Sequence, residues 1–176
     1  VGRSIIADAI FVDRFSVLAS ITVLGAVIFS SVLMTAYLQR SHEDGPELFA
    51  LFLTSAIGAI VMISANDLIV MFLGLEVLSL SLYLLAASNR RREQSQESGI
   101  KYFILGGFAS AFFLYGIALV YGSTGSTQLF VNQSLPQGIA QALGSQVTVI
   151  GNDSLLLIGI GLLMIGLAFK VSAVPF

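Results

Sequence analysis

The sequence predicts an all-α fold, a polytopic bundle of transmembrane helices, from its composition and from the spacing of its apolar residues. Hydrophobic residues make up 56% of the chain and charged residues only 10%, and the mean hydropathy is +0.94. A soluble domain of average composition is about 25% charged. The apolar residues come in long runs, and about 20 residues suffice to cross the hydrocarbon of a bilayer. Backbone N–H and C=O groups without a hydrogen-bond partner are costly in lipid, so such runs predict α-helices. A soluble all-α protein is the alternative.

Three successive runs predict the first three helices. The run at 15–38 contains no charged residue, and neither does the run at 48–65. After a short turn, the run at 68–87 is interrupted only by Glu76. Each of these runs is long enough to span a membrane. The first half of the chain is therefore expected to cross the bilayer three times.

Two more helices are expected at about 100–121 and 155–176, and the whole chain, 1–176, is expected to form a single transmembrane domain. An external loop at 122–154, rich in glycine, serine and glutamine, joins these two helices. A connection of that length is usually functional, packed by partners or flexible. In the last helix Pro175 has no backbone donor and crowds the preceding turn, which predicts a broken helix near Lys170.

The fourth predicted helix carries small residues four apart. One face holds Gly106 and Ser110, and the neighbouring face holds Gly107 and Ala111. Small residues at this spacing let the backbones of two membrane helices approach closely. We therefore expect one of these two faces to pack against another helix.

Basic residues in the connections predict the orientation, since basic loops tend to remain cytoplasmic. The loop between the third and fourth helices carries Arg90, Arg91 and Arg92, whereas the N-terminal segment carries only Arg3 and Arg14. We expect an integral protein of a bacterial inner membrane, with its N-terminal end outside and the arginine loop cytoplasmic. The alternative to a chemical role for these arginines is that they only set the topology of the chain in the membrane. The first residue is not methionine, so we expect a piece of a longer chain.

Several kinds of soluble-type site are excluded by the sequence. It contains no cysteine, which excludes disulfides and thiolate metal sites, and it has no metal-ligand spacing, phosphate-binding glycine loop or Ser/His/Asp arrangement. The single histidine, His42, lies in a polar loop, where a solvated side chain is the simpler interpretation. A net charge of -2 indicates no nucleic-acid partner. We therefore expect no cofactor and no metal in this chain.

Glu76 is the most informative residue of the third helix. An ionised side chain at the centre of a membrane helix costs about 3 kcal/mol on insertion scales, so such a residue normally has a partner or a task. It lies about 12 Å from the outer end of the helix, close to the bilayer midplane. Ser79 and Tyr83 share its face, so the sequence predicts a polar stripe that points into a bundle.

Lys101 and Lys170 are the other ionisable groups at or near membrane depth. Lys101 opens the fourth helix, where it either transfers protons or anchors the helix end by pairing with Glu97. Lys170 lies about 22 Å along the fifth helix, beside the predicted break; its alternative is a packed stem whose ammonium snorkels inward. Irregular backbone beside ionisable groups lines ion paths in transporters. One acid and two bases on successive helices thus suggest a proton relay.

Three segments of the chain resemble a known family: DLIVMFLGLEVLSLSLYLL, SGIKYFILGGFASAFFLYGIALVYGSTGS and LLMIGLAFKVSAVPF. They are similar to successive blocks of subunit N, an antiporter-like membrane subunit of the proton-translocating NADH:quinone oxidoreductase, respiratory complex I. The resemblance implies a partial antiporter-like fold. It matches Glu76 to the family's essential carboxylate, Lys101 to the lysine opening the next helix, and Lys170 to the central lysine of a broken helix. The family often has proline where this chain has Ser81, so the helix after Glu76 is expected to be straighter here.

The resemblance also implies what the chain does. It would be a proton-translocating subunit of an enzyme, coupling electron transfer from NADH to quinone to proton pumping through Glu76, Lys101 and Lys170. It would hold no redox centre, NADH and quinone would be used elsewhere in the complex, and its partners would be the other membrane-arm and peripheral subunits. Two alternatives stay open: a subunit of a multisubunit sodium/proton antiporter or a stand-alone cation/proton transporter, and a structural or assembly subunit.

Overall fold

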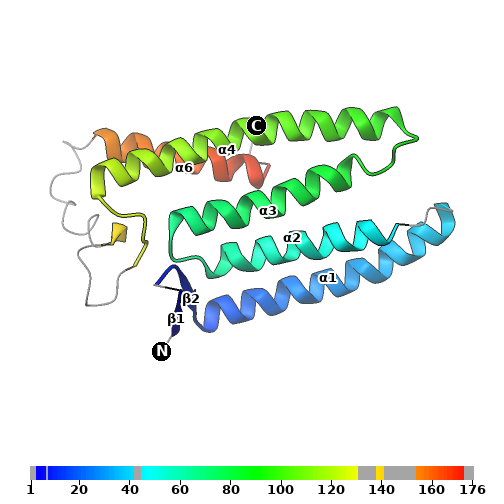
Figure 1. The fold of residues 1–176 in the computed structure, drawn as a ribbon, viewed down its shortest axis with the longest axis horizontal. Coiled ribbons are helices and arrows are strands. Elements are labelled where there is room, and N and C mark those ends of the chain that lie inside the picture. The colour runs from blue at the N-terminus through cyan, green and yellow to red at the C-terminus, as the bar shows by residue number, and fades with distance from the viewer. Residues whose placement is uncertain (1–2, 7, 42–44, 131–137, 141–153, 173–176) are drawn as a thin grey trace. The chain divides into compact units, whose positions relative to one another are not determined.

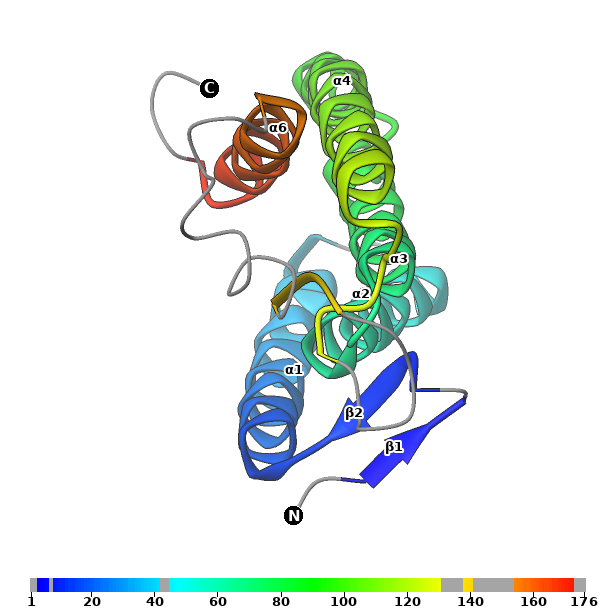
Figure 2. The ribbon, with the colours of Figure 1, turned by 90° about the vertical axis from the view of Figure 1, so that its left-hand side faces the viewer.

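The computed structural model is predominantly helical, which confirms the predicted fold class (Figure 1). It describes residues 3–6, 8–41, 45–130, 138–140 and 154–172. Two short strands, which the apolar pattern did not predict, pair with each other ahead of the helices (Figure 2). In chain order the elements are β1 (Arg3–Ile5), β2 (Ile10–Val12), α1 (Arg14–Ser41), α2 (Pro46–Ser64), α3 (Leu68–Ala86), α4 (Glu93–Thr124) and α6 (Ser154–Lys170).

The chain divides into two compact units, and each has its own packing. Apart from the first three residues, the first unit consists of Val12–Ser64 and Leu73–Ile104. The second unit consists of Ser4–Phe11, Ala65–Phe72 and Leu105–Phe176. The first unit therefore holds α1, α2, most of α3 and the start of α4, and the second holds the rest of α4 together with α6.

Among the described helices, α1 to α4 are long and apolar enough to cross a membrane. The 17 residues of α6 correspond to about 25 Å, short of the roughly 30 Å of a bilayer's hydrocarbon core. The fifth helix was predicted to run to 176. This extent was wrong, because α6 ends at Lys170 and a turn follows. Pro175, to which the break was attributed, lies outside the described residues.

α4 begins at Glu93, earlier than its apolar run predicted, because its polar first turns complete the end of α3. The hydroxyl of Ser95 donates to the carbonyl of Ala86 at 2.7 Å, and the side-chain amide of Gln96 donates to the carbonyl of Ala87 at 3.1 Å. The last carbonyls of a helix have no donor within the helix itself. These two side chains supply donors, so the hydrophilic start of α4 stabilises the C-terminus of α3.

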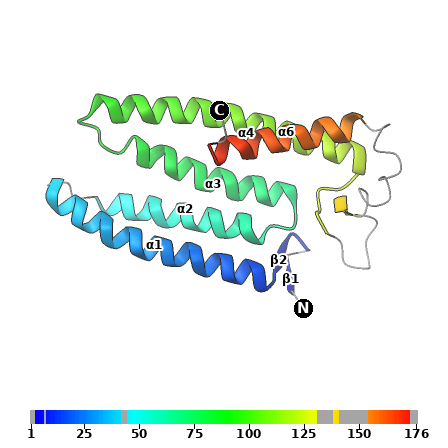
Figure 3. The same ribbon diagram turned by 180° about the vertical axis from the view of Figure 1, so that it is seen from behind.

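In the first unit, α2 lies beside α1 (Figure 3) and also touches α3 backbone to backbone. A Cβ atom on Gly58 would lie 2.5 Å from the backbone nitrogen of Leu78 and 2.7 Å from the carbonyl oxygen of Gly74. A Cβ atom on Gly74 would lie 2.7 Å from the backbone nitrogen of Met62. Only glycine permits this approach, which fixes α3 against α2 two residues before Glu76.

In the second unit, α4 and α6 pack through glycines in the same way (Figure 3). A Cβ atom on Gly116 would lie 2.8 Å from both the carbonyl oxygen of Gly159 and the backbone nitrogen of Leu163. One on Gly166 would lie 2.6 Å from the Cβ of Phe113, which is itself 1% exposed. The buried core around this contact consists of Leu68, Phe113, Ile117, Val120, Ile139 and Leu156.

The close packing predicted for the fourth helix occurs on one of its two candidate faces. Gly106 is buried, and its face continues through Ala109, Phe113 and Gly116 at helical spacing. Gly107 is exposed, and a Cβ atom there would meet no atom within 4 Å. The Gly106 face therefore carries the contact with α6, and the Gly107 face points away from it.

Gly116→Leu is expected to destabilise the protein, whereas Gly107→Leu on the same helix serves as the matched control. At Gly116 the new side chain must displace the backbone of α6, and overpacking of this kind costs about 1–3 kcal/mol or more. At Gly107 it enters open space. The level of assembled protein in membranes and its thermal stability after purification are the measurements. An equal loss of assembled protein in both variants would contradict the close packing of α4 against α6 at Gly116.

Asn66, which is 5% exposed, joins three segments of the second unit. Its side-chain amide donates to the carbonyls of Asp8 and Phe130, both at 2.8 Å, and its side-chain oxygen accepts from the amide of Phe130 at 3.2 Å. The neighbouring Asp67 caps α3 with one carboxylate oxygen and accepts from the hydroxyl of Thr127 at 2.5 Å with the other. The first residues of the predicted external loop are therefore bound to the turn between α2 and α3.

Candidate functional site

Glu76 is the ninth residue of α3, about 12 Å from its N-terminus and near its middle. Its side chain is half-buried. The rest of the helix is apolar apart from two serines and a tyrosine. The backbone contact at Gly74 lies less than one turn away and holds this part of α3 against α2. The carboxylate therefore stands at membrane depth on a helix that cannot easily turn or shift.

Ser79 and Tyr83 place the predicted polar stripe on the buried side of α3. Ser79 is fully buried, and Tyr83 is 6% exposed. The hydroxyl of Ser79 donates to the carbonyl of Leu75. Tyr83 follows Ser79 one turn later on the same face of α3. For these residues the expectation of an inward-facing stripe is confirmed.

Ser81 is also buried, at 3% exposure. Its hydroxyl donates to the carbonyl of Val77 at 2.9 Å, so the side chain is satisfied by its own helix. α3 continues past this position without interruption to Ala86. The expectation of a straighter helix, drawn from serine in place of the family's proline, stays a prediction, with the reason that proline would have removed a backbone donor here.

The polar stripe faces the first half of α4 through aromatic contacts. The ring of Tyr83 lies edge-on to that of Tyr102, with centroids 4.6 Å apart, and to that of Phe103, with centroids 5.9 Å apart. Such edge-to-face pairs stabilise a contact beyond the area that they bury. Tyr102 directly follows Lys101. Sequence reasoning did not single out Tyr102, because only the pairing of α3 with α4 brings it to the stripe.

Lys101 lies at the exposed edge of this contact. Its ammonium forms an ion pair with the carboxylate of Glu97, one turn earlier on α4, and the two side chains are 68% and 63% exposed. The pairing weighed as the anchoring alternative is therefore present. An exposed ion pair of this kind contributes little to stability. Lys101 thus stands beside the buried stripe with its charge directed away from the core.

Lys170 is the last residue of α6 and belongs to the second unit, whereas Glu76 and Lys101 belong to the first. Its side chain is half-buried. The helix stops here because Ser172 adopts a left-handed backbone conformation, with φ of 53°, and its amide bonds back to the carbonyl of Phe169 at 3.0 Å. A cation at a helix C-terminus is favoured by the helix dipole and by the open carbonyls of the last turn.

Proton donors and acceptors dominate the site. Within the described ranges, no three histidine, aspartate or glutamate side chains are grouped so that they could hold a metal ion, and His42 lies outside those ranges. Two phenols, Tyr83 and Tyr102, meet at the contact between α3 and α4, and a serine hydroxyl and a carboxylate lie on the same face of α3 as Tyr83. Groups of this kind exchange and relay protons without a bound cofactor.

Comparison with known proteins places the chain in a family. Residues 65–176 match the family described as NADH:quinone oxidoreductase/Mrp antiporter, TM. The chain is 42% identical over 176 residues to NADH-quinone oxidoreductase subunit N 1 of Sorangium cellulosum, covering 99% of this chain and 33% of that protein. It is 45% identical over 157 residues to subunit N of Rhodospirillum rubrum, covering 89% of this chain and 30% of that protein.

Solved structures show the same likeness. The fold matches a chain of respiratory complex I from Thermus thermophilus with bound aureothin, with a TM-score of 0.75 and 33% identity over 99% of this chain and 34% of that one. It also matches a chain of an archaeal membrane-bound sulfane sulfur reductase, with a TM-score of 0.66 and 29% identity over 90% of this chain and 30% of that one. The chain spans about a third of the length of the curated relatives it matches. It belongs to the NADH:quinone oxidoreductase/Mrp antiporter transmembrane family and resembles subunit N.

Proposed function

We propose that this chain carries protons as a membrane subunit of a proton-translocating NADH:quinone oxidoreductase. The observation that carries the proposal is Glu76, a half-buried carboxylate midway along an apolar membrane helix and backed by the buried Ser79 and Tyr83. An ionisable group at that depth is costly to keep unless it has a task. Similarity to subunit N proteins over nearly the whole chain supports the same assignment.

In this proposal the chain is part of an enzyme but holds no redox centre. NADH is oxidised and quinone is reduced in other subunits, and the membrane-arm and peripheral subunits are its partners. The relatives named as subunits of NADH-quinone oxidoreductase support this division of work. The chain's own contribution is a set of proton-exchanging groups held by close helix packing.

The stripe on α3 gives the proton a route toward the end of α4. Glu76 would hold the proton near the middle of the membrane, Ser79 and Tyr83 follow it on the same face of α3, and the ring of Tyr83 contacts that of Tyr102. Lys101 directly precedes Tyr102 in the chain. Hydroxyl groups both donate and accept, so they pass a proton on without holding a charge. Lys101, with its partner Glu97, would then exchange protons at the exposed end of the route.

Lys170 would act at the end of α6. Its half-buried side chain and its place at the C-terminus of α6 support a role among the proton-exchanging groups of the relay. A lysine relays protons only if it releases one and takes it up again, which an arginine in the same place cannot do.

The proposed location is a bacterial inner membrane, with the N-terminal end outside and Arg90 to Arg92 in the cytoplasm. The basic loop supports this orientation. Residues that follow α1, among them Gly45, line one pocket with Arg90 and Arg91, so the two polar connections lie at the same end of the first unit. The arginines predict that the connection between α3 and α4 is cytoplasmic, and the connection between α1 and α2 would then be cytoplasmic as well.

An antiporter subunit is the second candidate, because the family's own description joins the oxidoreductase with Mrp antiporters. Purification of the tagged protein from its source membranes separates the two. A complex I subunit is expected to copurify with NADH-oxidising activity and with peripheral subunits. Recovery of the chain only in a membrane assembly that exchanges cations for protons without NADH would favour the antiporter and overturn the first proposal.

Tyr83→Phe is expected to slow proton pumping about tenfold, since a positioned proton-transfer group contributes at least that much. Phenylalanine keeps the ring that packs on Tyr102, so the variant should assemble normally. Tyr115→Phe, at an exposed position on α4, removes a hydroxyl outside the stripe and is the control. NADH-driven acidification of inverted vesicles is the measurement. Unchanged pumping in Tyr83→Phe would remove Tyr83 from the route.

A further inference from the structure

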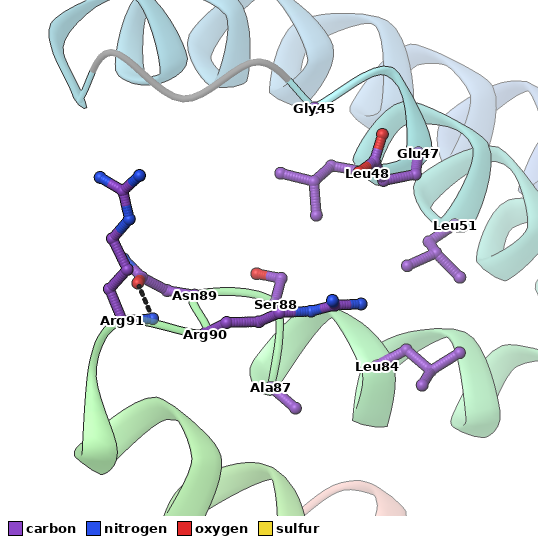
Figure 4. A pocket seen from close by; sticks show the side chains of 10 residues that line it. All are labelled: Gly45, Glu47, Leu48, Leu51, Leu84, Ala87, Ser88, Asn89, Arg90 and Arg91. Carbon is purple, nitrogen blue, oxygen red and sulfur yellow. Dashed lines mark hydrogen bonds between the residues drawn. The ribbon is translucent and has the colours of Figure 1, made fainter.

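An open pocket lies at one end of the first unit, between the start of α2 and the end of α3 (Figure 4). Its volume is about 520 Å³. Leu48, Leu51 and Leu84 form its apolar part, while Arg90 and Arg91 stand at its polar part. Because α2 begins and α3 ends here, the pocket lies at the depth where a transmembrane helix meets the lipid headgroups.

The pocket carries basic charge that the described residues do not neutralise by an ion pair. Arg90 and Arg91 have no salt-bridge partner among the described side chains, and Glu47 is the acidic residue in the described lining. In Figure 4 the side chain of Arg90 extends toward Leu51 and Leu84, whereas Arg91 points to the other side of the opening. A guanidinium group over an apolar surface can take an anionic group whose other part is apolar.

The apolar part of the pocket continues along the membrane helix. Leu84 is 57% exposed, and Leu80, one turn deeper on the same face, is 47% exposed. Val77 and Leu73 extend this stripe toward the middle of α3. An exposed apolar stripe on a transmembrane helix faces lipid chains at no cost. The stripe begins at the basic end of the pocket and runs in the direction that an acyl chain takes from its headgroup.

We propose that this pocket binds an anionic phospholipid, with its headgroup in the opening between Arg90 and Arg91 and one acyl chain along Leu84 and Leu80. Guanidinium groups bind phosphate oxygens through paired, charge-assisted hydrogen bonds, which a zwitterionic headgroup satisfies less well. The occupant is a lipid rather than free phosphate because the basic and apolar parts are continuous. This inference rests on the membrane helices and does not depend on proton pumping.

The test uses the intact complex, stripped of lipid and supplied with phosphatidylglycerol that carries a photoreactive group on one acyl chain. After illumination, labelled peptides are mapped by mass spectrometry. We expect label on the peptide that contains Leu80 and Leu84. Arg90→Gln or Arg91→Gln should lower this label about tenfold, as loss of a charge-assisted hydrogen bond implies. Arg92→Gln is the matched control, because Arg92 has the same charge and loop but does not line the pocket.

Arg90→Lys keeps the charge and should keep most of the label. The amount of complex is matched in all samples, so that a folding defect does not change the measured labelling. Equal labelling of wild type by photoreactive phosphatidylcholine would overturn the proposal, because the surface would then face lipid without choosing it. Equal loss in Arg92→Gln would overturn it in favour of diffuse loop charge. If inorganic phosphate protected Arg90 from modification by phenylglyoxal as strongly as the lipid does, the pocket would be reassigned to free phosphate.

Discussion

Glu76→Gln is expected to abolish most NADH-driven proton pumping while the complex still assembles. Glutamine keeps the size and hydrogen-bonding capacity of the carboxylate, but it cannot ionise and so cannot take up and release a proton. Loss of a positioned proton-transfer group costs about two orders of magnitude in rate. Assembly should survive because an amide is cheaper to bury than a carboxylate and the contact of α3 with α2 at Gly74 is untouched. Pumping and NADH:quinone turnover are measured in inverted vesicles at matched complex levels.

Two further variants make this result specific. Glu76→Asp retains an ionisable group on a shorter stem and should pump better than Glu76→Gln. Glu93→Gln removes an exposed carboxylate from the first turn of α4 and should pump normally. Wild-type pumping in Glu76→Gln would show that this carboxylate has no part in proton transfer.

The buried stripe could be predicted from the sequence because helical spacing fixes which residues share a face. Glu76, Ser79 and Tyr83 stand at intervals of three and four, so any helix over this segment groups them. Burial of the group followed from the cost of a charge in lipid. Both arguments are local and need no knowledge of the neighbouring helix. This is why the stripe was predicted, while its partner Tyr102 was not.

Contacts between distant segments lay beyond this kind of reasoning. The side chain of Asn66 donates to the backbone carbonyls of two residues that lie 58 and 64 positions away in the sequence. Every residue type has such a carbonyl, so nothing in the sequence marks these two as partners. The glycine contact between α2 and α3 was missed for a related reason. Gly58 and Gly74 lie on different helices, and the residues four positions from Gly74, Val70 and Leu78, are large, so α3 alone does not show the small-residue spacing that marks a close approach.

Helix ends were the least predictable feature, because side chains outside the apolar run decide them. The start of α4 is set by Ser95 and Gln96, which complete the end of α3. The end of α6 is set by the backbone of Ser172. Hydropathy registers neither effect. The sequence nevertheless predicted a break beside Lys170, and the helix does end there, so the residue of interest was placed correctly although the extent of its helix was not.

Lys170→Arg is expected to impair pumping almost as severely as Lys170→Ala, and this separates a relay from an anchor. A lysine that passes protons must be able to release one, whereas arginine stays protonated at any accessible pH. At the end of α6, arginine would supply the same charge to the helix dipole and the open carbonyls. An electrostatic or anchoring role would therefore survive the change, and proton exchange would not.

The decisive comparison is therefore between the two Lys170 variants and not between either one and wild type. NADH-driven acidification of inverted vesicles is measured at matched complex levels, with the electron-transfer rate recorded alongside. We expect Arg and Ala to lose pumping together, by about two orders of magnitude if proton transfer through this group is obligatory. Lys101→Arg is expected to impair pumping as well, because the proposed route exchanges protons at Lys101, whereas near-normal pumping would leave Lys101 only the anchoring ion pair with Glu97. Near-normal pumping in Lys170→Arg with loss in Lys170→Ala would mean that Lys170 contributes its charge alone, and the relay would have to pass through other groups at the end of α6.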